Sequence, residues 1–214
     1  MDPQTIDTLY RSRLTLLEIL KSRGYNTTPY EKFGPWEVER MVSTGSGGMR
    51  MDLVHSVEGD PRKCRVVYTF QNKRQSVIPF ITSNFLDEES SDAVDPQNTE
   101  AVVIMLVPVV DAFNAGALWA WQKHQLRIGF FNAESLVNDP RNHIDVPKHE
   151  RLTPDEEIAV RKQFHILKKS NLPIIKFHQD IQARLMFLME REICKITRGS
   201  PTGGEYVVYR VCAP

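Results

Sequence analysis

The first apolar pattern along the chain predicts an amphipathic helix. Four apolar residues recur at spacings of three, seven and four, which places them on one helical face: Ile6, Leu9, Leu16 and Leu20. Gly24 follows the last of them, and glycine readily adopts the left-handed conformation with which many helices end. We therefore expect a helix that begins near Thr5 or Asp7 and is closed by Gly24.

Two strand-like runs come next along the chain. Residues 51–57 and residues 65–70 are rich in the valine, leucine and aromatic side chains that favour strands. Between them lie Gly59, Asp60 and Pro61, which are typical turn residues. The sequence therefore predicts that the two runs pair as a β-hairpin.

The most apolar run of the chain predicts a central strand. Residues 101–107 are continuously apolar and mostly β-branched, as expected of a strand that is covered on both faces. Residues 111–123 have a helical pattern, and residues 126–131 return to a strand pattern. Strand, helix and strand in this order predict a βαβ crossover, and hence a layered α/β structure for this part of the chain.

A change of pattern predicts a domain boundary. Residues 138–142 read Asn-Asp-Pro-Arg-Asn, which is turn chemistry with no apolar side chain. We therefore divide the chain into an N-terminal domain of residues 1–142 and a C-terminal domain of residues 143–214.

The C-terminal domain opens with a strong helix start. Thr153 can cap the helix, Pro154 suits its first position, and Glu156 completes a capping box. Three apolar residues are expected to form the buried stripe of this helix: Val160, Phe164 and Leu167. The helix is expected to end at Leu172 and Pro173.

A second helix and a hairpin follow. The helix is expected from about residue 180 to residue 189, and strands are expected at residues 192–197 and 206–212. Residues 199–204 between the strands contain proline and glycine, which favour a turn. The sequence thus predicts a small mixed α/β domain that contains a β-hairpin.

Composition excludes several classes of protein. Of the 214 residues, 27 are lysine or arginine and 27 are aspartate or glutamate, so no overall positive field attracts the chain to nucleic acid or membranes. The chain start lacks the features of a secretory signal, and residues 101–110 are half the length of a membrane span. The cysteines form no CxxC pair, which indicates a reducing, intracellular setting; we interpret Cys194 and Cys212 as small buried residues without assigning them another role.

One pattern suggests catalysis, but it is incomplete. Metal-dependent nucleases place an aspartate before a tripeptide of acid, any residue and lysine, and here Asp52 precedes Gln71-Asn72-Lys73. The reaction needs at least two carboxylates to hold Mg²⁺, and Gln71 is neutral. We therefore expect no catalytic residue, no metal and no cofactor; a Mg²⁺-dependent nuclease that uses Asp52 and Lys73 is the alternative.

Four segments, in order along nearly the whole chain, carry the motifs of one known family. They are a helix ending in Arg23-Gly24-Tyr25, the run Arg50-Met51-Asp52-Leu53, a linker with Val146-Pro147-Lys148-His149, and a C-terminal signature that includes Leu172-Pro173, Asp180-Ile181-Gln182-Ala183-Arg184, Lys195-Ile196 and Tyr206-Val207-Val208-Tyr209-Arg210. In these motifs the chain resembles the fifth subunit of the eukaryotic nuclear DNA-dependent RNA polymerases. Its C-terminal third is also similar to the small archaeal counterpart of that subunit.

The resemblance implies a fold and a function. It implies an α+β protein whose N-terminal domain is a three-layer α/β jaw of nuclease-like fold near the downstream DNA. It further implies that the C-terminal assembly domain docks on the largest polymerase subunit, beside neighbouring small subunits. The chain would then be a non-catalytic nuclear subunit that supports assembly and the jaw. A free-standing adaptor that binds a transcription regulator is a further alternative.

The resemblance also indicates which residues bind the partner. Nine residues of the linker, the second helix and the hairpin are the candidates for partner binding: Pro147, His149, Arg184, Glu190, Arg191, Arg198, Tyr206, Tyr209 and Arg210. Arginine and tyrosine are enriched where protein interfaces gain most of their affinity.

Two departures from the family pattern are informative. Residues 189–192 read Met-Glu-Arg-Glu where the family has Lys-Arg-Gly-Gln, which reverses one charge and removes a turn glycine. Such a change can select between similar partners, so this loop predicts a preference for one of polymerases I, II and III, without indicating which one. A subunit that all three share, and whose loop has simply drifted in sequence, is the alternative. Residues 108–111 contain no basic side chain where the family has a loop that points toward DNA, which argues against direct DNA contact.

Overall fold

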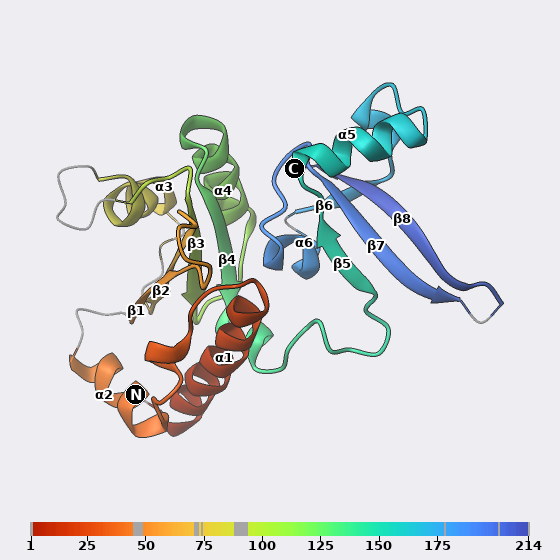
Figure 1. Cartoon of the computed structure of the whole chain (residues 1–214). Coiled ribbons are helices and arrows are strands. Elements are labelled where there is room, and N and C mark those ends of the chain that lie inside the picture. The colour runs from red at the N-terminus through yellow and green to blue at the C-terminus, as the bar shows by residue number, and fades with distance from the viewer. Residues whose placement is uncertain are drawn as a thin grey trace. The chain divides into compact units, whose positions relative to one another are not determined.

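The chain folds into two compact units, which bear out the predicted α+β class. The computed structural model describes residues 2–44, 49–70, 73, 75–87, 94–177, 179–200 and 202–213. Unit 1 comprises Met1–Asp139 and unit 2 comprises Pro140–Pro214, each with its own sheet (Figure 1). The sequence-based boundary lies three residues further along, after residue 142. In the described part of the chain no helix has both the length and the apolar composition needed to cross a membrane.

Unit 1 is built around a four-stranded sheet in the order β1-β2-β3-β4. Its strands are β1 (Arg50–Val54), β2 (Lys63–Thr69), β3 (Thr99–Met105) and β4 (Arg127–Asn132). Its helices are α1 (Pro3–Ser22), η1 (Thr28–Tyr30), α2 (Pro35–Thr44), α3 (Val77–Ile81), the π-helix η2 (Thr82–Leu86), α4 (Asp111–His124) and η3 (Ala133–Leu136). Strand β1 runs antiparallel to β2, whereas β2, β3 and β4 are parallel.

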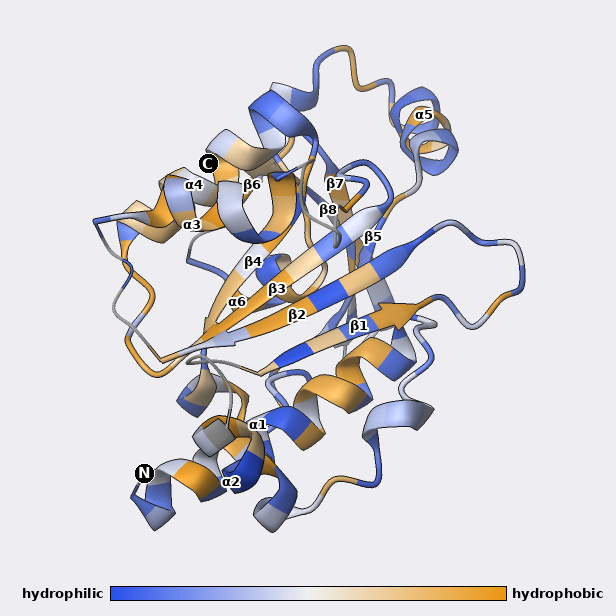
Figure 2. Cartoon of the chain, turned by 90° about the vertical axis from the view of Figure 1, so that its left-hand side faces the viewer, coloured by the Kyte–Doolittle hydropathy of each residue, from blue (hydrophilic) through white to orange (hydrophobic). Residues whose placement is uncertain are grey.

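Helices cover both faces of this sheet. Figure 2 shows α1 and α2 on one side, and α3 and α4 on the other, which confirms the three-layer arrangement. Every residue of β3 is buried, as its continuous apolar run predicts. The β3-α4-β4 segment is the predicted βαβ crossover, and β1 and β2 form the predicted hairpin. The proposed kinship to nucleases stays a prediction.

Helix α1 follows the apolar pattern that predicts it. Its four pattern residues are buried: Ile6, Leu9, Leu16 and Leu20. It begins at Pro3, a little before the expected start, because proline suits the first turn of a helix. Gly24 has a φ of 90°, so the chain uses the left-handed conformation that we expected at this residue. The strand that follows, β1, is shorter than expected and ends at Val54.

Unit 2 also holds a four-stranded sheet, in the order β5-β7-β8-β6. Its elements are β5 (Lys148–Arg151), α5 (Pro154–Gln163), η4 (Lys169–Asn171), β6 (Ile174–Lys176), α6 (Ile181–Leu185), β7 (Ile193–Ser200) and β8 (Gly204–Ala213). Strands β7 and β8 form the predicted hairpin, from Ile193 opposite Val211 to Ser200 opposite Gly204. Strands β5 and β6 were not predicted, because three or four residues are too few to show a periodic pattern.

The predicted buried stripe of α5 is wrong in two of its three residues. Val160 is buried, but the side chains of Phe164 and Leu167 are exposed, with relative exposures of 52% and 83%. The helix ends at Gln163, because His165 adopts a left-handed φ of 52°. The backbone N–H of Ile166 then donates to Arg161, in the 6→1 pattern of a Schellman motif.

Helix α6 is also shorter than expected, and for the same reason. It ends at Leu185, where residues up to 189 were predicted to be helical. Phe187 has a φ of 50°, and the N–H of Leu188 donates to the carbonyl of Ala183. Both helices therefore stop at a left-handed residue that is not glycine, which a search for glycine caps does not find.

Candidate functional site

The free end of the β7–β8 hairpin is the most exposed part of the unit 2 sheet. Strand β5 pairs with β7 only as far as Thr197, and β6 pairs with β8 only from Val211 onward. The tip therefore extends beyond both neighbouring strands (Figure 1). Tyr206 and Val207 near the tip are 46% and 43% exposed. Because consecutive residues of a strand point to opposite faces, each face of the hairpin carries one of these two exposed side chains near the tip.

The register of the hairpin divides the predicted hairpin residues between two faces. Tyr206 and Arg210 point to the same face because they are four residues apart in a strand, and Arg198 joins them because it lies opposite Tyr206. Tyr209 points to the other face. The sequence grouped Tyr206, Tyr209 and Arg210 as one set, and the two-residue period of the strand separates Tyr209 from the others.

Tyr209 and Arg210 both hold the hairpin to the rest of unit 2. The ring of Tyr209 packs against Phe164 at the end of α5, with 5.6 Å between ring centroids. Arg210 donates from Nη1 to the carbonyl oxygen of Ile174 at 2.9 Å, which ties β8 to β6. Tyr206 and Arg198 lie nearer the tip and are exposed, so they are the residues best placed to meet a partner.

The linker places His149 on the same face as Tyr206. His149 lies opposite Ile196 of β7, which in turn lies opposite Val208 of β8. The Nδ1 atom of His149 lies 2.7 Å from the carbonyl oxygen of Pro147. Because a carbonyl oxygen can only accept a hydrogen bond, Nδ1 must carry the proton and donate it. The same hydrogen bond stabilises the turn at Pro147. We call the surface formed by His149, Arg198, Tyr206, Val208 and Arg210 the hairpin face.

Arg184 lies on α6, and its surroundings are structural. Asp180 caps this short helix by accepting from the N–H groups of Gln182 and Ala183 at 2.8 and 3.4 Å. The Arg184 side chain is partly buried, and this burial lowers the pKa of its guanidinium. It is therefore less available to a partner than Arg198, which is exposed at the hairpin tip.

Glu190 and Arg191 lie at the other end of the hairpin. Both line a cavity of about 870 Å³ beside the last residues of β8. The N–H of Arg191 donates to the carbonyl of Cys212 at 3.0 Å. Arg191 has a φ of 68°, in the left-handed region that favours glycine. This is the position at which the family pattern has glycine, so the chain keeps the turn although the glycine is absent.

The first residue of the 189–192 loop is not accessible to a partner. Met189 is only 3% exposed, and its N–H donates to Glu192 at 2.8 Å. Any effect of this loop on partner choice must therefore come from the more exposed Glu190, Arg191 and Glu192.

Several exposed apolar residues of unit 2 were not among the predicted site residues. They are Ile144, Ile158, Phe164, Leu167, Ile174 and Val207. Two of them had a usable signal in the sequence. Ile158 is two residues from Val160 on a helix, so the two cannot share a face. Val207 lies between two other apolar residues in a strand, so both faces of that strand are apolar.

In unit 1, Asp52 is engaged by arginines. Its carboxylate accepts from Nε of Arg50 and from Nε of Arg65, each at 2.7 Å. These residues line a cavity of about 360 Å³. Lys73 is described but Gln71 and Asn72 lie outside the described residues. Within the described ranges, no group of three histidine, cysteine or acidic residues could hold a metal ion.

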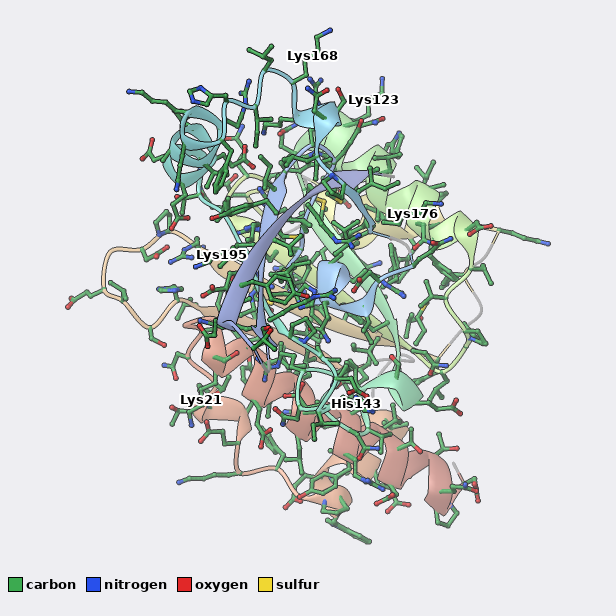
Figure 3. All side chains as sticks on the ribbon, turned by 90° about the vertical axis from the view of Figure 1, so that its right-hand side faces the viewer. Lys21, Lys123, His143, Lys168, Lys176 and Lys195 are labelled. Carbon is green, nitrogen blue, oxygen red and sulfur yellow. The ribbon has the colours of Figure 1, made fainter. Side chains whose placement is uncertain are left out.

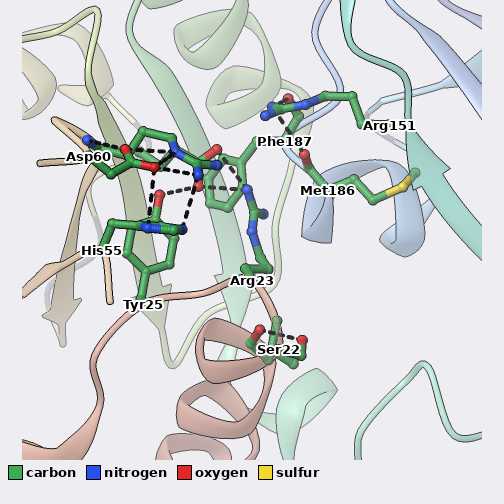
Figure 4. A network of polar contacts seen from close by, with 11 residues as sticks. Ser22, Arg23, Tyr25, His55, Asp60, Arg151, Met186 and Phe187 are labelled. Atoms are coloured by element: carbon green, nitrogen blue, oxygen red, sulfur yellow. Dashed lines mark hydrogen bonds and ion pairs between the residues drawn. The ribbon is translucent and has the colours of Figure 1, made fainter. Parts of the chain in front are cut away.

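A buried polar network joins the end of α1 to the sheet of unit 1 (Figure 4). Arg23 pairs with Glu100 at 2.6 Å, and the hydroxyl of Tyr25 donates to the same carboxylate at 2.8 Å. Burial and the nearby Glu100 carboxylate raise the pKa of Tyr25, so its hydroxyl keeps the proton that it donates. His55 packs edge-on against Tyr25 and lies 3.2 Å from Asp60. These contacts join the end of α1 to β3 and to the β1–β2 hairpin.

The three cysteines are free and buried, which agrees with our interpretation of Cys194 and Cys212. Burial raises the pKa of Cys194 to about 11 and that of Cys212 to about 12, so both stay as thiols at neutral pH.

Comparisons with known proteins place unit 2 in one family. The family model described as RNA polymerase Rpb5, C-terminal domain, matches residues 139–212. The chain is 43% identical over 79 residues to DNA-directed RNA polymerase subunit Rpo5 of Sulfurisphaera tokodaii. This alignment covers 37% of this chain and 92% of the relative. Over 210 residues it is 26% identical to a Dictyostelium discoideum protein named DNA-directed RNA polymerases I, II, and III subunit rpabc1, which covers 98% of this chain and 99% of the relative. A relative of the same name from Caenorhabditis elegans is 23% identical over 209 residues, covering 95% of this chain and 94% of the relative.

Proposed function

Because this chain belongs to the Rpb5 family of DNA-directed RNA polymerase subunits, we propose that it docks on the largest subunit through the hairpin face of unit 2. The chain is a structural subunit of a DNA-dependent RNA polymerase that functions in transcription. The largest subunit as the direct partner, neighbouring small subunits as further contacts, and the nucleus as the location are parts of the proposal.

The observation that carries the proposal is the coincidence of the family match with unit 2. The match covers residues 139–212, and unit 2 comprises Pro140–Pro214. The Sulfurisphaera tokodaii relative is short, because the 79 aligned residues make up 92% of it but only 37% of this chain, about the length of unit 2. A relative of that length that is still named as a polymerase subunit supports unit 2 as the part that joins the polymerase.

The chemistry of the hairpin face suits a protein partner. Tyr206 offers a large, partly exposed ring, and Arg198 beside it offers an exposed guanidinium. Tyrosine and arginine supply much of the affinity of protein interfaces, because each combines a flat apolar surface with directed hydrogen bonds. His149 extends the same face along β5, and Pro147 immediately precedes that strand.

Unit 1 supports a function without catalysis. A Mg²⁺ ion needs carboxylates that are free to bind it, and the Asp52 carboxylate already accepts from two arginines. Arg50 and Arg65 also bring positive charge to the place where a cation would bind. We therefore propose that unit 1 is a jaw that supports the polymerase near downstream DNA and carries no active site of its own.

Copurification tests the docking surface. The tagged full chain and a fragment of residues 140–214 are each coexpressed with the largest polymerase subunit, and both should copurify with it. Tyr206→Ala should weaken binding by about 2 kcal/mol, or about thirtyfold, as for a residue at the centre of an interface. Glu205→Ala is the matched control, because Glu205 is also exposed but its side chain points to the opposite face. Equal binding by the Tyr206 and Glu205 variants would show that the hairpin face is not the docking surface.

A further inference from the structure

Unit 2 holds a groove at the end of the hairpin remote from its tip. It is the cavity of about 870 Å³ that lies between the end of α5, the η4 segment and the last residues of β8. Val211 lines it, five residues along β8 from Tyr206, which is about 17 Å at the rise of a strand. We call it the basic groove and define it by Arg161, Leu167, Lys168, Lys169, Ile174 and Arg191.

The basic groove concentrates positive charge in a chain that has none overall. Four basic residues line it and Glu190 is the acidic one. The whole chain has 27 basic and 27 acidic residues, so this positive charge is local. Two of the four cations are held in place by the fold. Arg161 donates to the carbonyl of Leu167 at 3.0 Å, and Lys169 pairs with Glu157.

The other two cations are available to a ligand. The side chains of Lys168 and Arg191 are exposed, and neither side chain forms a hydrogen bond or an ion pair with a residue that the structure describes. Figure 3 shows Lys168 at the outer edge of unit 2. Exposed cations beside fixed ones favour a ligand with several negative charges, because each carboxylate can then meet a separate partner.

Apolar side chains in the groove indicate which kind of anionic ligand it binds. Leu167 and Ile174 line the groove and are mostly exposed to solvent. A nucleic-acid backbone would engage the cations but gain little from two aliphatic side chains, and neither is an aromatic ring on which a base could stack. A peptide that carries both acidic and apolar residues would use the cations and the aliphatic surface together.

The conformation of Arg191 is a second, independent observation. A side chain at a φ of 68° is strained, and glycine would remove the strain. The backbone N–H of Arg191 donates to the carbonyl of Cys212, so the turn does not depend on the Arg191 side chain. Backbone strain of this kind is retained at sites where the side chain has a function, and the side chain of Arg191 lines the groove.

We propose that the basic groove binds an acidic peptide segment of a protein partner. Carboxylates of the segment pair with Arg161, Lys168 and Arg191, and an apolar side chain of the segment packs on Leu167 and Ile174. The proposal goes beyond docking by the hairpin face, because Tyr206 and Arg198, which carry the proposed docking, lie near the tip, whereas the groove lies at the other end of β8.

Fluorescence anisotropy with the full chain tests the proposal. The probe is a labelled synthetic peptide of alternating aspartate and glutamate interrupted by leucines. We expect micromolar affinity that falls as salt is added, because exposed ion pairs are screened. The double variant Lys168→Glu with Arg191→Glu should weaken binding by about tenfold or more, since like charges then face the peptide. The matched control is Lys32→Glu with Lys123→Glu, which makes the same change of charge at exposed lysines of unit 1.

Two further probes separate the peptide from other anions. The same peptide with serine in place of leucine should bind several-fold more weakly, and a single-stranded DNA oligonucleotide of equal charge should bind more weakly still. Absence of binding by the leucine peptide, or equal loss in the unit 1 control variant, would overturn the proposal. Binding of DNA as tight as that of the peptide, with the same sensitivity to Lys168→Glu, would also overturn it and assign the groove to nucleic acid.

Arg191→Gly distinguishes a binding role from a structural one. This variant should bind the leucine peptide several-fold more weakly while its melting temperature stays equal or rises, because glycine relieves the strained turn. Retained affinity, or a lower melting temperature, would contradict the role proposed for the Arg191 side chain.

Discussion

Replacement of Gly24 by alanine should destabilise unit 1 through a defined clash. Gly24 has a φ of 90°, and a Cβ atom added there would lie 2.4 Å from Nε2 of His55. His55 cannot simply move aside, because it packs on Tyr25 and lies 3.2 Å from Asp60. The substitution therefore perturbs both the backbone and the buried polar network.

The size of the effect follows from these contacts. An alanine in the left-handed conformation costs about 1–2 kcal/mol. Displacing His55 also costs its edge-on packing against Tyr25, about 1 kcal/mol. We expect Gly24→Ala to reduce the free energy of unfolding by about 2–3 kcal/mol, which corresponds to a fall in melting temperature of about 8 °C.

Gly59 offers a matched control for the backbone part of this effect. Its φ of 85° is nearly the same, but a Cβ atom there would meet nothing within 4 Å. Gly59→Ala should therefore cost about 1 kcal/mol, so the difference between the two variants measures the clash with His55.

Urea denaturation followed by tryptophan fluorescence is the appropriate assay. The 3 tryptophans of the chain, Trp36, Trp119 and Trp121, all lie in unit 1, so the signal reports on that unit. Equal losses of stability in the Gly24 and Gly59 variants would refute the reasoning from His55. A smaller loss for Gly24→Ala than for Gly59→Ala would refute it more strongly.

Three further predictions concern stability, pH and catalysis. Arg191→Gly should raise the free energy of unfolding of unit 2 by about 0.5–1 kcal/mol in calorimetry, because glycine accepts a φ of 68° without strain; a decrease would contradict this. Hydrogen bonds from Arg62 lower the pKa of Asp60 from 3.8 to about 2, so its carboxylate stabilises the fold above about pH 4 and this contribution is lost as the pH falls toward 2. The stability difference between the native chain and Asp60→Asn should therefore shrink over that range in urea titrations, and a constant difference would count against the assignment. The purified chain should not cleave DNA with Mg²⁺ or Mn²⁺, since Asp52 is paired with Arg50 and Arg65; cleavage that Asp52→Ala abolishes would show the opposite.

Elements with strong periodic patterns could be predicted from the sequence, and the ends of helices could not. Helix α1, the β3-α4-β4 crossover and the β7–β8 hairpin each have an apolar pattern, periodic or, in β3, continuous, that one structure satisfies. The ends of α5 and α6 depend on His165 and Phe187 in the left-handed conformation. Nothing in the identity of these two residues signals that conformation, so the sequence extends both helices too far.

In the candidate site, too, features with a local sequence pattern could be predicted, and features that depend on tertiary contacts could not. Sequence motifs identified the hairpin, but only the register shows that Tyr209 faces α5 while Tyr206 lies exposed near the tip. The basic groove combines side chains from α5, η4, the 189–192 loop and β8, which are far apart in the sequence. Such a site has no local pattern, because it exists only after the elements have packed together.

The most direct test of the account is to purify the tagged full chain from its source cells and identify its partners by mass spectrometry. We expect the largest subunit of a DNA-dependent RNA polymerase and the other subunits of that enzyme in near-equal amounts with the chain. The Tyr206→Ala variant should recover much less of them, whereas Glu205→Ala should recover as much as the native chain. Recovery of a single regulator without polymerase subunits, or of no partner at all, would contradict the claim that the chain is a polymerase subunit.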